Sequence, residues 1–135
     1  MRIVVLAVGK LKPPWGDDVE HYRRLLGRHA RVEIVEVRED EHVERRLPKD
    51  AYVCVLDRKG DALSSEAFAA FLEERRQAGR DVCFVLGGPF GSSLEQADRR
   101  ISFGPITLPH QLARVVLLEQ LYRGHKILAN EPYHY

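Results

Sequence analysis

The chain has 135 residues, 44% of them hydrophobic and 30% charged, and its formal net charge is +1. This length and composition exclude a disordered chain and predict a single domain over residues 1–135. No apolar run is long enough to span a membrane, and no secretory signal is recognised, so we expect a cytoplasmic protein without a membrane partner. The nearly neutral charge argues against a general RNA binder, but it allows a protein that recognises one shaped site with a local basic patch.

The first part of the chain predicts a strand, a helix and a second strand. Arg2–Val8 is a continuous apolar run, typical of a central strand that is covered on both faces. A helix capped by Asp17 or Asp18 follows, and Val32–Val37 is strand-like. The helix carries one apolar stripe, made of Val19, Tyr22, Leu25 and Leu26.

The middle of the chain predicts a further strand and helix. The charged segment Arg38–Arg46 is interpreted as a short solvated helix, and Tyr52–Leu56 as a strand that ends in a turn at Asp57–Asp61. Ser64 or Ser65 is expected to cap the next helix. The inward-facing residues of that helix and its end are predicted at Phe68, Phe71, Leu72 and Gly79.

The last third predicts two strands and a long helix. Val82–Leu86 is a strand, Ser93–Asp98 a short helix and Ile101–Phe103 a brief strand. Pro109 suits the first turn of the final helix. The apolar arc of this helix is wider than one sheet face needs, so we expect the excess to cover a second surface, such as a partner subunit. The arc comprises Leu112, Val115, Val116, Leu117, Leu118, Leu121 and Tyr122.

The alternation of strands and helices predicts an α/β fold, with a mostly parallel sheet and helices on both faces. In such a fold small ligands bind at the carboxyl ends of the strands. Cys54 and Cys83 lie inside apolar strand patterns and are interpreted as buried free thiols. No cysteine–histidine spacing is typical of a zinc site, so we expect no metal.

Three segments after predicted strands favour a ligand site. The glycine turn Leu86–Gly91 allows close approach of backbone amides, although it matches neither a dinucleotide fingerprint nor a phosphate-binding loop. Phe103–Leu108 keeps the chain out of a helix and exposes backbone groups, which an adenine edge, water or neighbouring loops would satisfy. Leu56–Gly60 is the third segment. An ordinary strand-to-helix turn remains the alternative for the glycine segment.

The titratable residues define no familiar hydrolase or kinase site. There is no Ser-His-Asp set at a nucleophile elbow, no H-E-x-x-H motif and no Walker lysine. A bound cofactor is therefore expected to carry the chemistry. Histidines gather in the last third, and the aromatic end Tyr133–Tyr135 is unlike a frayed tail, so we expect it to dock near a site.

Taken together, the motifs resemble the ribosomal large-subunit RNA methyltransferase H family of the SPOUT class. The similarity extends end to end, and its most specific pieces are Thr107-Leu108-Pro109-His110, Glu119-Gln120-Leu121-Tyr122-Arg123 and Pro132-Tyr133-His134. The resemblance implies a homodimer, a C-terminal trefoil knot and S-adenosylmethionine as cofactor. The implied reaction is methylation at N3 of a pseudouridine in large-subunit ribosomal RNA, on assembled ribosomes. The implied cofactor-binding residues are Leu56, Gly87, Phe103, Gly104, Pro105, Ile106, Thr107 and Leu108.

Our hypothesis for catalysis uses the C-terminal tail, from the same subunit or its partner. His134 acts as base or hydrogen-bonding positioner, Tyr133 stacks on or orients the nucleobase, and Arg114 stabilises charge or holds a phosphate. The chain departs from the family pattern in three places. It is shorter, around residues 38–50; Tyr135 replaces a terminal arginine; and Phe103-Gly104 replaces Leu-Ser.

A local basic patch is expected to contact nearby RNA. Two rival functions remain open: a non-catalytic ribosome-binding or assembly factor on the same fold, and a nucleotide-handling enzyme that acts on a small metabolite. The second lacks a phosphate-binding lysine and metal-binding carboxylates. The patch comprises Lys10, Lys12, Arg23, Arg24 and Arg28.

Overall fold

The structure is a computed structural model that describes residues 1–88 and 92–133. Its core is a five-stranded sheet in the order β2-β1-β4-β3-β5, and every neighbouring pair is parallel. This arrangement confirms the predicted α/β class and makes the sheet wholly parallel. All strands therefore end at one edge, the carboxyl edge. The strands are β1 (Arg2–Val8), β2 (Arg31–Val37), β3 (Tyr52–Ala62), β4 (Val82–Leu86) and β5 (Arg99–Ser102).

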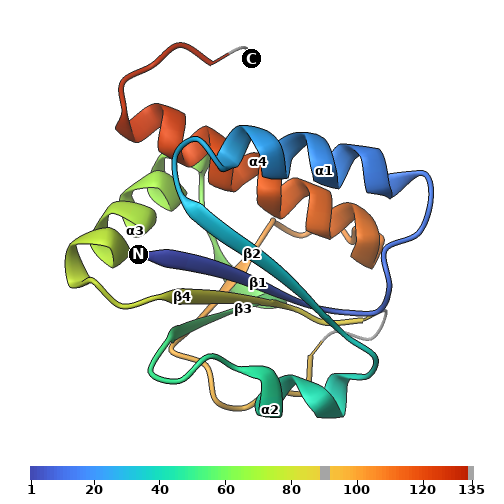
Figure 1. The fold of residues 1–135 in the computed structure, drawn as a ribbon. Coiled ribbons are helices and arrows are strands. Elements are labelled where there is room, and N and C mark those ends of the chain that lie inside the picture. Colours follow the sequence, from blue (N-terminus) through green and yellow to red (C-terminus); the bar gives the residue numbers. More distant parts are fainter. Residues whose placement is uncertain (89–91, 134–135) are drawn as a thin grey trace.

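Helices cover the two faces of the sheet unequally (Figure 1). The long helices α1 (Trp15–Leu26), α3 (Ser65–Ala78) and α4 (His110–Leu128) pack on one face. The other face carries only the turn η1 (Asp40–His42) and the short helix α2 (Val43–Arg46). The prediction of helices on both faces is confirmed, although the three long helices all lie on one face.

Strand β1 shows why the N-terminal run is apolar without interruption. Ile3 and Val5 join the core beneath the three long helices, whereas Val4 and Leu6 join the core beside α2. All four side chains are buried. Because successive strand residues point to opposite faces, a central strand between two cores needs apolar residues at every position.

The helix ends partly match the predictions. Ser64 caps α3, since its Oγ accepts a hydrogen bond from Ala67 N at 3.0 Å, and Gly79 ends the helix with φ of 80°. Helix α1 instead begins at Trp15, after Pro14. The prediction that Asp17 or Asp18 caps it is therefore wrong, and both carboxylates lie in its first turn, where they favour the helix dipole.

The short helix predicted at Ser93–Asp98 is absent, because neighbouring elements hold this segment in an irregular conformation. Asp40 accepts a hydrogen bond from Ser93 N at 2.9 Å, and Asp98 accepts one from Val53 N at 2.8 Å. Leu94 is buried in the core beside α2. The segment thus covers part of the face of the sheet that otherwise carries only η1 and α2.

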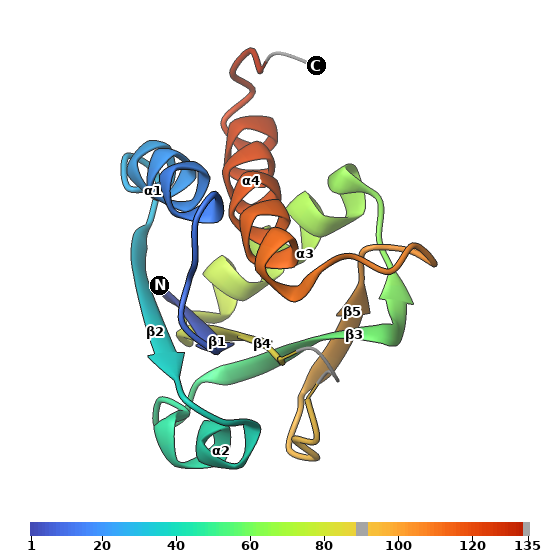
Figure 2. The same cartoon turned by 90° about the vertical axis from the view of Figure 1, so that its right-hand side faces the viewer.

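The wide apolar arc of α4 is largely used within the chain. Helix α4 lies between α1 and α3 and also faces the sheet (Figure 2). Three surfaces of one chain therefore account for most of the arc, and its width alone does not indicate a partner. Ile127 and Leu128, at the end of the helix, are the large apolar side chains that α4 leaves exposed. Among the described residues, no helix has the length and apolar character required to cross a bilayer.

Both cysteines are buried free thiols, as predicted. Cys54 and Cys83 have no exposed surface, and burial raises the pKa of each thiol to about 12. At neutral pH they behave as small apolar side chains.

Candidate functional site

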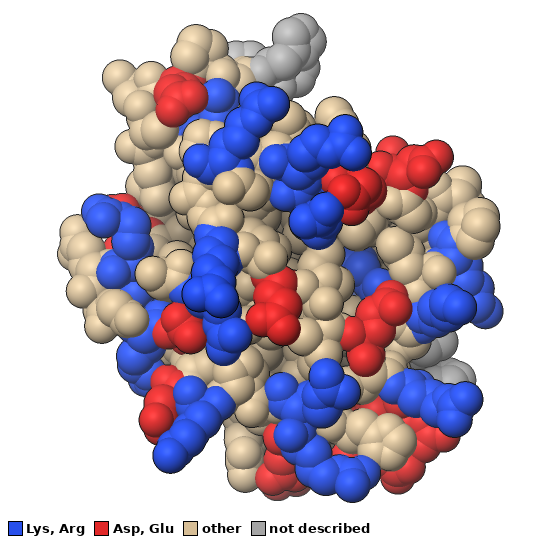
Figure 3. Space-filling model, in the orientation of Figure 1, with Lys and Arg blue, Asp and Glu red and all other residues tan. Residues whose placement is uncertain are grey.

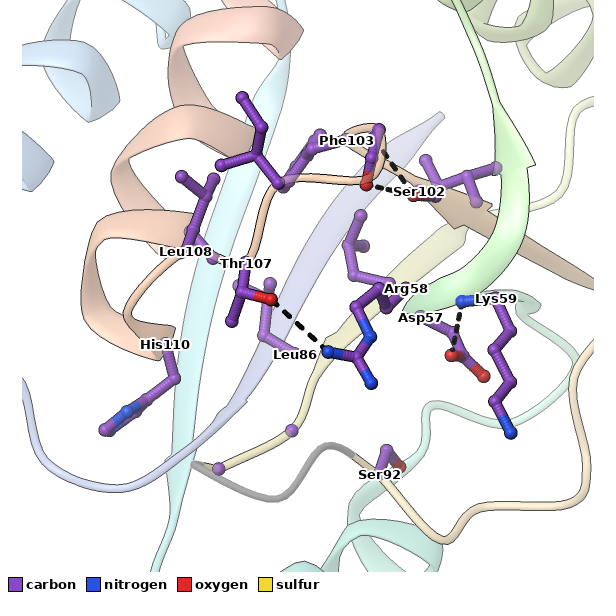
Figure 4. A pocket seen from close by; sticks show the side chains of 17 residues that line it. Asp57, Arg58, Lys59, Leu86, Ser92, Ser102, Phe103, Thr107, Leu108 and His110 are labelled. Carbon is purple, nitrogen blue, oxygen red and sulfur yellow. Dashed lines mark hydrogen bonds between the residues drawn. The ribbon is translucent and has the colours of Figure 1, made fainter.

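A cavity of about 530 Å³ opens at the carboxyl edge of the sheet (Figure 4). The ends of β3 and β4, the loop that follows β5 and the start of α4 form its walls. The three segments selected from the sequence thus converge on one cavity, whose size is typical of small-ligand sites. Of the predicted cofactor-binding residues, Leu56, Gly87, Phe103, Gly104, Ile106, Thr107 and Leu108 line it, whereas Pro105 does not.

The segment after Leu56 does not end β3 in a turn, as the sequence predicts. Strand β3 continues to Ala62 and pairs with β5 on both sides of an irregularity, because Leu56 and Asp61 both face Ile101 in the ladder. The residues between them leave the regular pairing, and Asp57, Arg58 and Lys59 line the cavity. The excursion therefore supplies the polar wall of the site.

Gly60 allows this excursion to rejoin the sheet. A Cβ atom on Gly60 would lie 2.6 Å from the backbone carbonyl carbon of Arg100 and 2.7 Å from the backbone nitrogen of Ile101. Backbone atoms of a neighbouring strand cannot move aside easily, so only glycine permits this close approach.

Charges of both signs lie in the polar wall. Asp57 accepts hydrogen bonds from the backbone of Lys59 at 2.9 Å and from Arg100 Nη1 at 3.2 Å. Arg58 reaches across the cavity, and its Nη1 donates to Thr107 Oγ1 at 3.3 Å (Figure 4). This wall can bind a ligand end that carries both an ammonium and a carboxylate group.

The loop after β5 is shaped by Ser102 and Gly104. Ser102 Oγ accepts a hydrogen bond from Gly104 N and donates one to Gly104 O, both at 3.0 Å. Gly104 has φ of 102°, a conformation that glycine adopts without strain. The turn brings residues 103, 104 and 106–108 to the cavity beside the apolar side chains of Leu56 and Leu86. A flat apolar ring with hydrogen-bonding edges would fit this side.

Arg114 does not line the cavity. It is buried beneath the loop that follows β1, where Nη2 donates to Gly9 O at 3.0 Å and Nη1 lies 2.5 Å from Glu36 Oε2. Gln111, one turn earlier, accepts a hydrogen bond from Lys12 N at 2.7 Å and donates one to Lys10 O at 2.9 Å. The first turns of α4 thus fix the Gly9–Lys12 loop.

Tyr133 docks against the middle and C-terminal half of α4, away from its first turn at the cavity. Its ring lies 5.0 Å from that of Tyr122, and the Arg123 guanidinium stands over it at 4.3 Å. Burial, together with the negative charge of Glu119, raises the pKa of Tyr133 to about 12. Nine residues of helix, about 14 Å along the axis, separate Glu119 from His110 at the cavity. The predicted residue His134 lies outside the described residues.

Sequence reasoning overlooked several lining residues. Asp57, Arg58 and Lys59 belong to a strand end that the sequence marked, yet none was chosen as a site residue. Ser102 and His110 also line the cavity. For His110 the available signal was its place directly after Pro109, at the start of the helix that follows the exposed loop.

Within the part of the chain that the structure describes, one group of side chains has ligand atoms close enough to hold a metal ion. Glu39, Glu41 and His42 lie on or beside η1, with their ligand atoms within 4.8 Å of one another. The two carboxylates are exposed, and none of the three lines the cavity. The absence of a metal at the site stays a prediction.

The structure is thus a small α/β protein with a ligand-sized cavity at the carboxyl edge of a parallel sheet. A family model described as "Predicted SPOUT methyltransferase" matches residues 1–134. The chain therefore belongs to the SPOUT methyltransferase family.

Relatives with one shared name match almost the whole chain. A "Ribosomal RNA large subunit methyltransferase H" from Rubrobacter xylanophilus is 46% identical over an alignment of 155 positions, gaps included, which covers 99% of this chain and 98% of the relative. The protein of that name from Stenotrophomonas maltophilia strain R551-3 is 42% identical, with 99% of each chain covered. The one from Thermotoga neapolitana is 36% identical, with both chains covered completely.

Proposed function

We propose that this protein is an S-adenosylmethionine-dependent methyltransferase that acts on N3 of a pseudouridine in large-subunit ribosomal RNA, within assembled ribosomes. The convergence of the β3 end, the β4 end and the loop after β5 on one cavity is the observation that carries the proposal. The name of the relatives, which describes a ribosomal RNA large-subunit methyltransferase, supports the substrate class.

The residues of the cavity fit this cofactor. Residues 103, 104 and 106–108, which line the cavity beside Leu56 and Leu86, suit an adenine ring, which needs a flat apolar contact and hydrogen bonds at its edge. The polar wall offers Asp57 to an ammonium group and Arg58 and Lys59 to a carboxylate. S-adenosylmethionine carries all three groups, and when bound it supplies a methyl group on a positively charged sulfur.

The residues of the chain have to align the nucleobase with the methyl group and to remove one proton from the nucleobase. In-line transfer requires the accepting nitrogen about 3–3.5 Å from the methyl carbon. The imide N3 must also lose its proton, and charge then develops on the flanking oxygens. We propose that His134 accepts this proton and that Tyr133 stacks on the nucleobase. Arg114 is buried away from the cavity, which favours a role in holding the Gly9–Lys12 loop over direct contact with the base.

The docking of Tyr133 favours a homodimer in which each tail serves the cavity of the partner. In Figure 2 residues 129–133 extend from the end of α4 opposite the loop that leads into the helix, and that loop lines the cavity. Exposed Ile127 and Leu128 lie near the start of the tail and offer apolar surface to a second copy. The proposal includes the C-terminal trefoil knot of the family; part of the path concerned, residues 89–91, lies outside the described residues.

Titration with S-adenosylmethionine tests the proposal and separates it from a non-catalytic ribosome-binding factor. The wild type is expected to bind the cofactor and to transfer a labelled methyl group to ribosomes that lack the modification. Gly104→Val should weaken cofactor binding at least tenfold, because valine resists a φ of 102°. Gly16→Ala, at an open position in α1, is the control. Ribosome binding without cofactor binding would favour the non-catalytic factor.

A further inference from the structure

A second hollow, of about 470 Å³, lies at the carboxyl end of β2. It is lined by the last residues of β2 and by the segment that leads through η1 into α2. We call it the arginine groove, after Arg38, Arg45 and Arg46, which line it together with Glu36, Val37 and His42. None of these residues was selected as a site residue from the sequence.

The three arginines are free to bind a ligand. Arg38, Arg45 and Arg46 are exposed, and within residues 1–88 and 92–133 none of them forms an ion pair or a side-chain hydrogen bond. Arg23 and Arg76 are paired with a glutamate on the same helix. Arg28 and Arg31 are also exposed and unpaired among the described residues, but they line neither hollow. Unpaired guanidinium groups around one hollow form a ready site for phosphate, which they bind through two parallel hydrogen bonds.

The carboxylate of Glu36 does not cancel this positive charge, because it is already bound from the protein side. Arg114 Nη1 and the backbone nitrogen of Leu11, at 2.8 Å, both donate to Glu36 Oε2. Although partial burial opposes it, these donors lower the pKa of Glu36. Gln96 Nε2 donates a hydrogen bond to Glu44, which orients this carboxylate but leaves its charge. Asp40, which accepts hydrogen bonds from Ser93, and Glu39 and Glu41 beside it are the other acidic neighbours. The segment is therefore not positive in net charge, and the site rests on three unpaired guanidinium groups that surround one hollow.

The arginine groove and the cofactor cavity open at the same edge of the sheet. The sheet order places β2 two strands away from β4, a lateral distance of about 10 Å. The Gly9–Lys12 loop after β1 lies between them and is joined to the end of β2, since Gly9 N donates to Val37 O at 2.8 Å. In Figure 3, blue basic side chains lie over the region of α2, with acidic ones among them.

We propose that the arginine groove binds backbone phosphates of the RNA whose nucleotide enters the cofactor cavity. This inference rests on the proposed function, and it adds a surface to the basic residues expected from the sequence. A single DNA-binding module buries about 600–1,000 Å² of protein, a patch roughly 25–30 Å across, and strands β2 and β4 lie well within such a width of each other. Phosphate contacts at the groove would set the register of the RNA, while the cavity selects the nucleotide.

The test compares ribosome binding of the wild type with that of an Arg45→Gln/Arg46→Gln variant over about 0.05–0.3 M KCl. Each lost phosphate contact lowers the slope of log affinity against log salt by about 0.7–0.9, so the double variant should lose about 1.5 in slope. Its affinity near 0.1 M salt should fall at least tenfold. Affinity for S-adenosylmethionine should not change, because neither arginine lines that cavity.

The matched control is Arg31→Gln/Lys49→Gln, which removes the same charge from exposed positions near the amino ends of β2 and β3. It should leave the salt slope within about 0.3 of the wild type. An unchanged slope in the groove variant, or weaker binding with the slope preserved, would overturn the phosphate site while leaving the methyltransferase proposal intact. A wild type that binds ribosomes but not S-adenosylmethionine would instead refute the proposed function. Thermal melting of each variant shows whether it is folded.

Discussion

Nη1 of Arg114 lies 2.5 Å from Oε2 of Glu36, so the start of α4 is tied to the carboxyl end of β2. The two partners are unequally placed, because the Arg114 side chain is 2% exposed and that of Glu36 is 38% exposed. A buried cation that loses its partner costs more free energy than an exposed carboxylate that can turn to water.

This difference in burial predicts which of two variants loses more free energy of unfolding. Glu36→Ala leaves a buried guanidinium without a counter-charge and should lower the free energy of unfolding by about 2–4 kcal/mol. Arg114→Met retains most of the apolar packing and leaves the carboxylate half-exposed, so its cost should be about 1–2 kcal/mol. Urea unfolding of both variants measures the difference. A greater loss in Arg114→Met would contradict the argument.

The burial of His125 should make the stability of the fold depend on pH. Burial lowers the pKa of its imidazole, and Nδ1 lies 2.7 Å from Leu121 O. As the pH falls below the unfolded value of about 6.5, the unfolded chain takes up the proton first, so the free energy of unfolding declines until the pH reaches the lower pKa of the folded state. His125→Gln should therefore lose less stability than the wild type between about pH 7.5 and pH 5.5.

The measurement is the melting temperature at both ends of that range. His21→Gln, at an exposed position on α1, is the control and should follow the wild type. Equal losses in the wild type and in His125→Gln would show that the burial of His125 does not govern this dependence.

Gly60 connects the stability of the sheet to cofactor binding. A Cβ atom there would meet the Arg100 backbone at 2.6 Å, so Gly60→Ala should push β3 and β5 apart and cost about 1–3 kcal/mol. The displaced Asp57–Lys59 wall should also weaken S-adenosylmethionine binding, measured by calorimetry. Gly9→Ala is the comparison. Its φ is 96°, so alanine strains the backbone there, but an added Cβ atom would meet no other atom within 4 Å. This variant should therefore lose stability without displacing β3, and its cofactor affinity should be unchanged.

The thiols of Cys54 and Cys83 should be unreactive in the folded protein. With pKa values of about 12 and no exposed surface, neither forms a thiolate at pH 8. A chromogenic disulfide reagent should detect neither thiol under native conditions and both in denaturant. Rapid native labelling of either thiol would show that the sheet core opens more readily than its packing indicates.

Subunit complementation tests which tail serves which cavity. A heterodimer of His134→Ala with Gly104→Val carries one intact cavity on the first subunit and one intact tail on the second. A tail that acts on the partner restores one working site, up to about half the wild-type activity, whereas a tail that acts on its own subunit restores none. Each variant alone should be inactive, and methyl transfer to ribosomes is the readout.

The sequence predicted the elements whose signal is local. The uninterrupted apolar run of β1, the Ser64 cap and the Gly79 end of α3 each follow from residues close in the chain, and the structure confirms all three. The three segments that follow strands were also recognised from local sequence. They converge on one cavity because parallel strands bring their carboxyl ends to one edge of the sheet.

The features that were missed depend on partners distant in the sequence. Ser93 meets Asp40, and this contact competes with a local helix. The re-pairing of Asp61 with Ile101 converts an expected turn into an excursion of a long strand. The burial of Arg114 away from the cavity likewise depends on Glu36 and Gly9, which lie 78 and 105 residues away along the chain. Periodicity carries no information about such pairings.

Because every strand runs the same way, Met1 precedes β1 at the amino edge, where the backbone nitrogen of Arg2 donates to Asp81 Oδ1 at 3.0 Å. An affinity handle or surface tether attached in front of Met1 would leave the cavity and the arginine groove pointing away from the support. A handle fused after the last residue would instead extend the segment that begins at docked Tyr133. Immobilised ribosome-capture assays with this protein should therefore be anchored through its amino terminus.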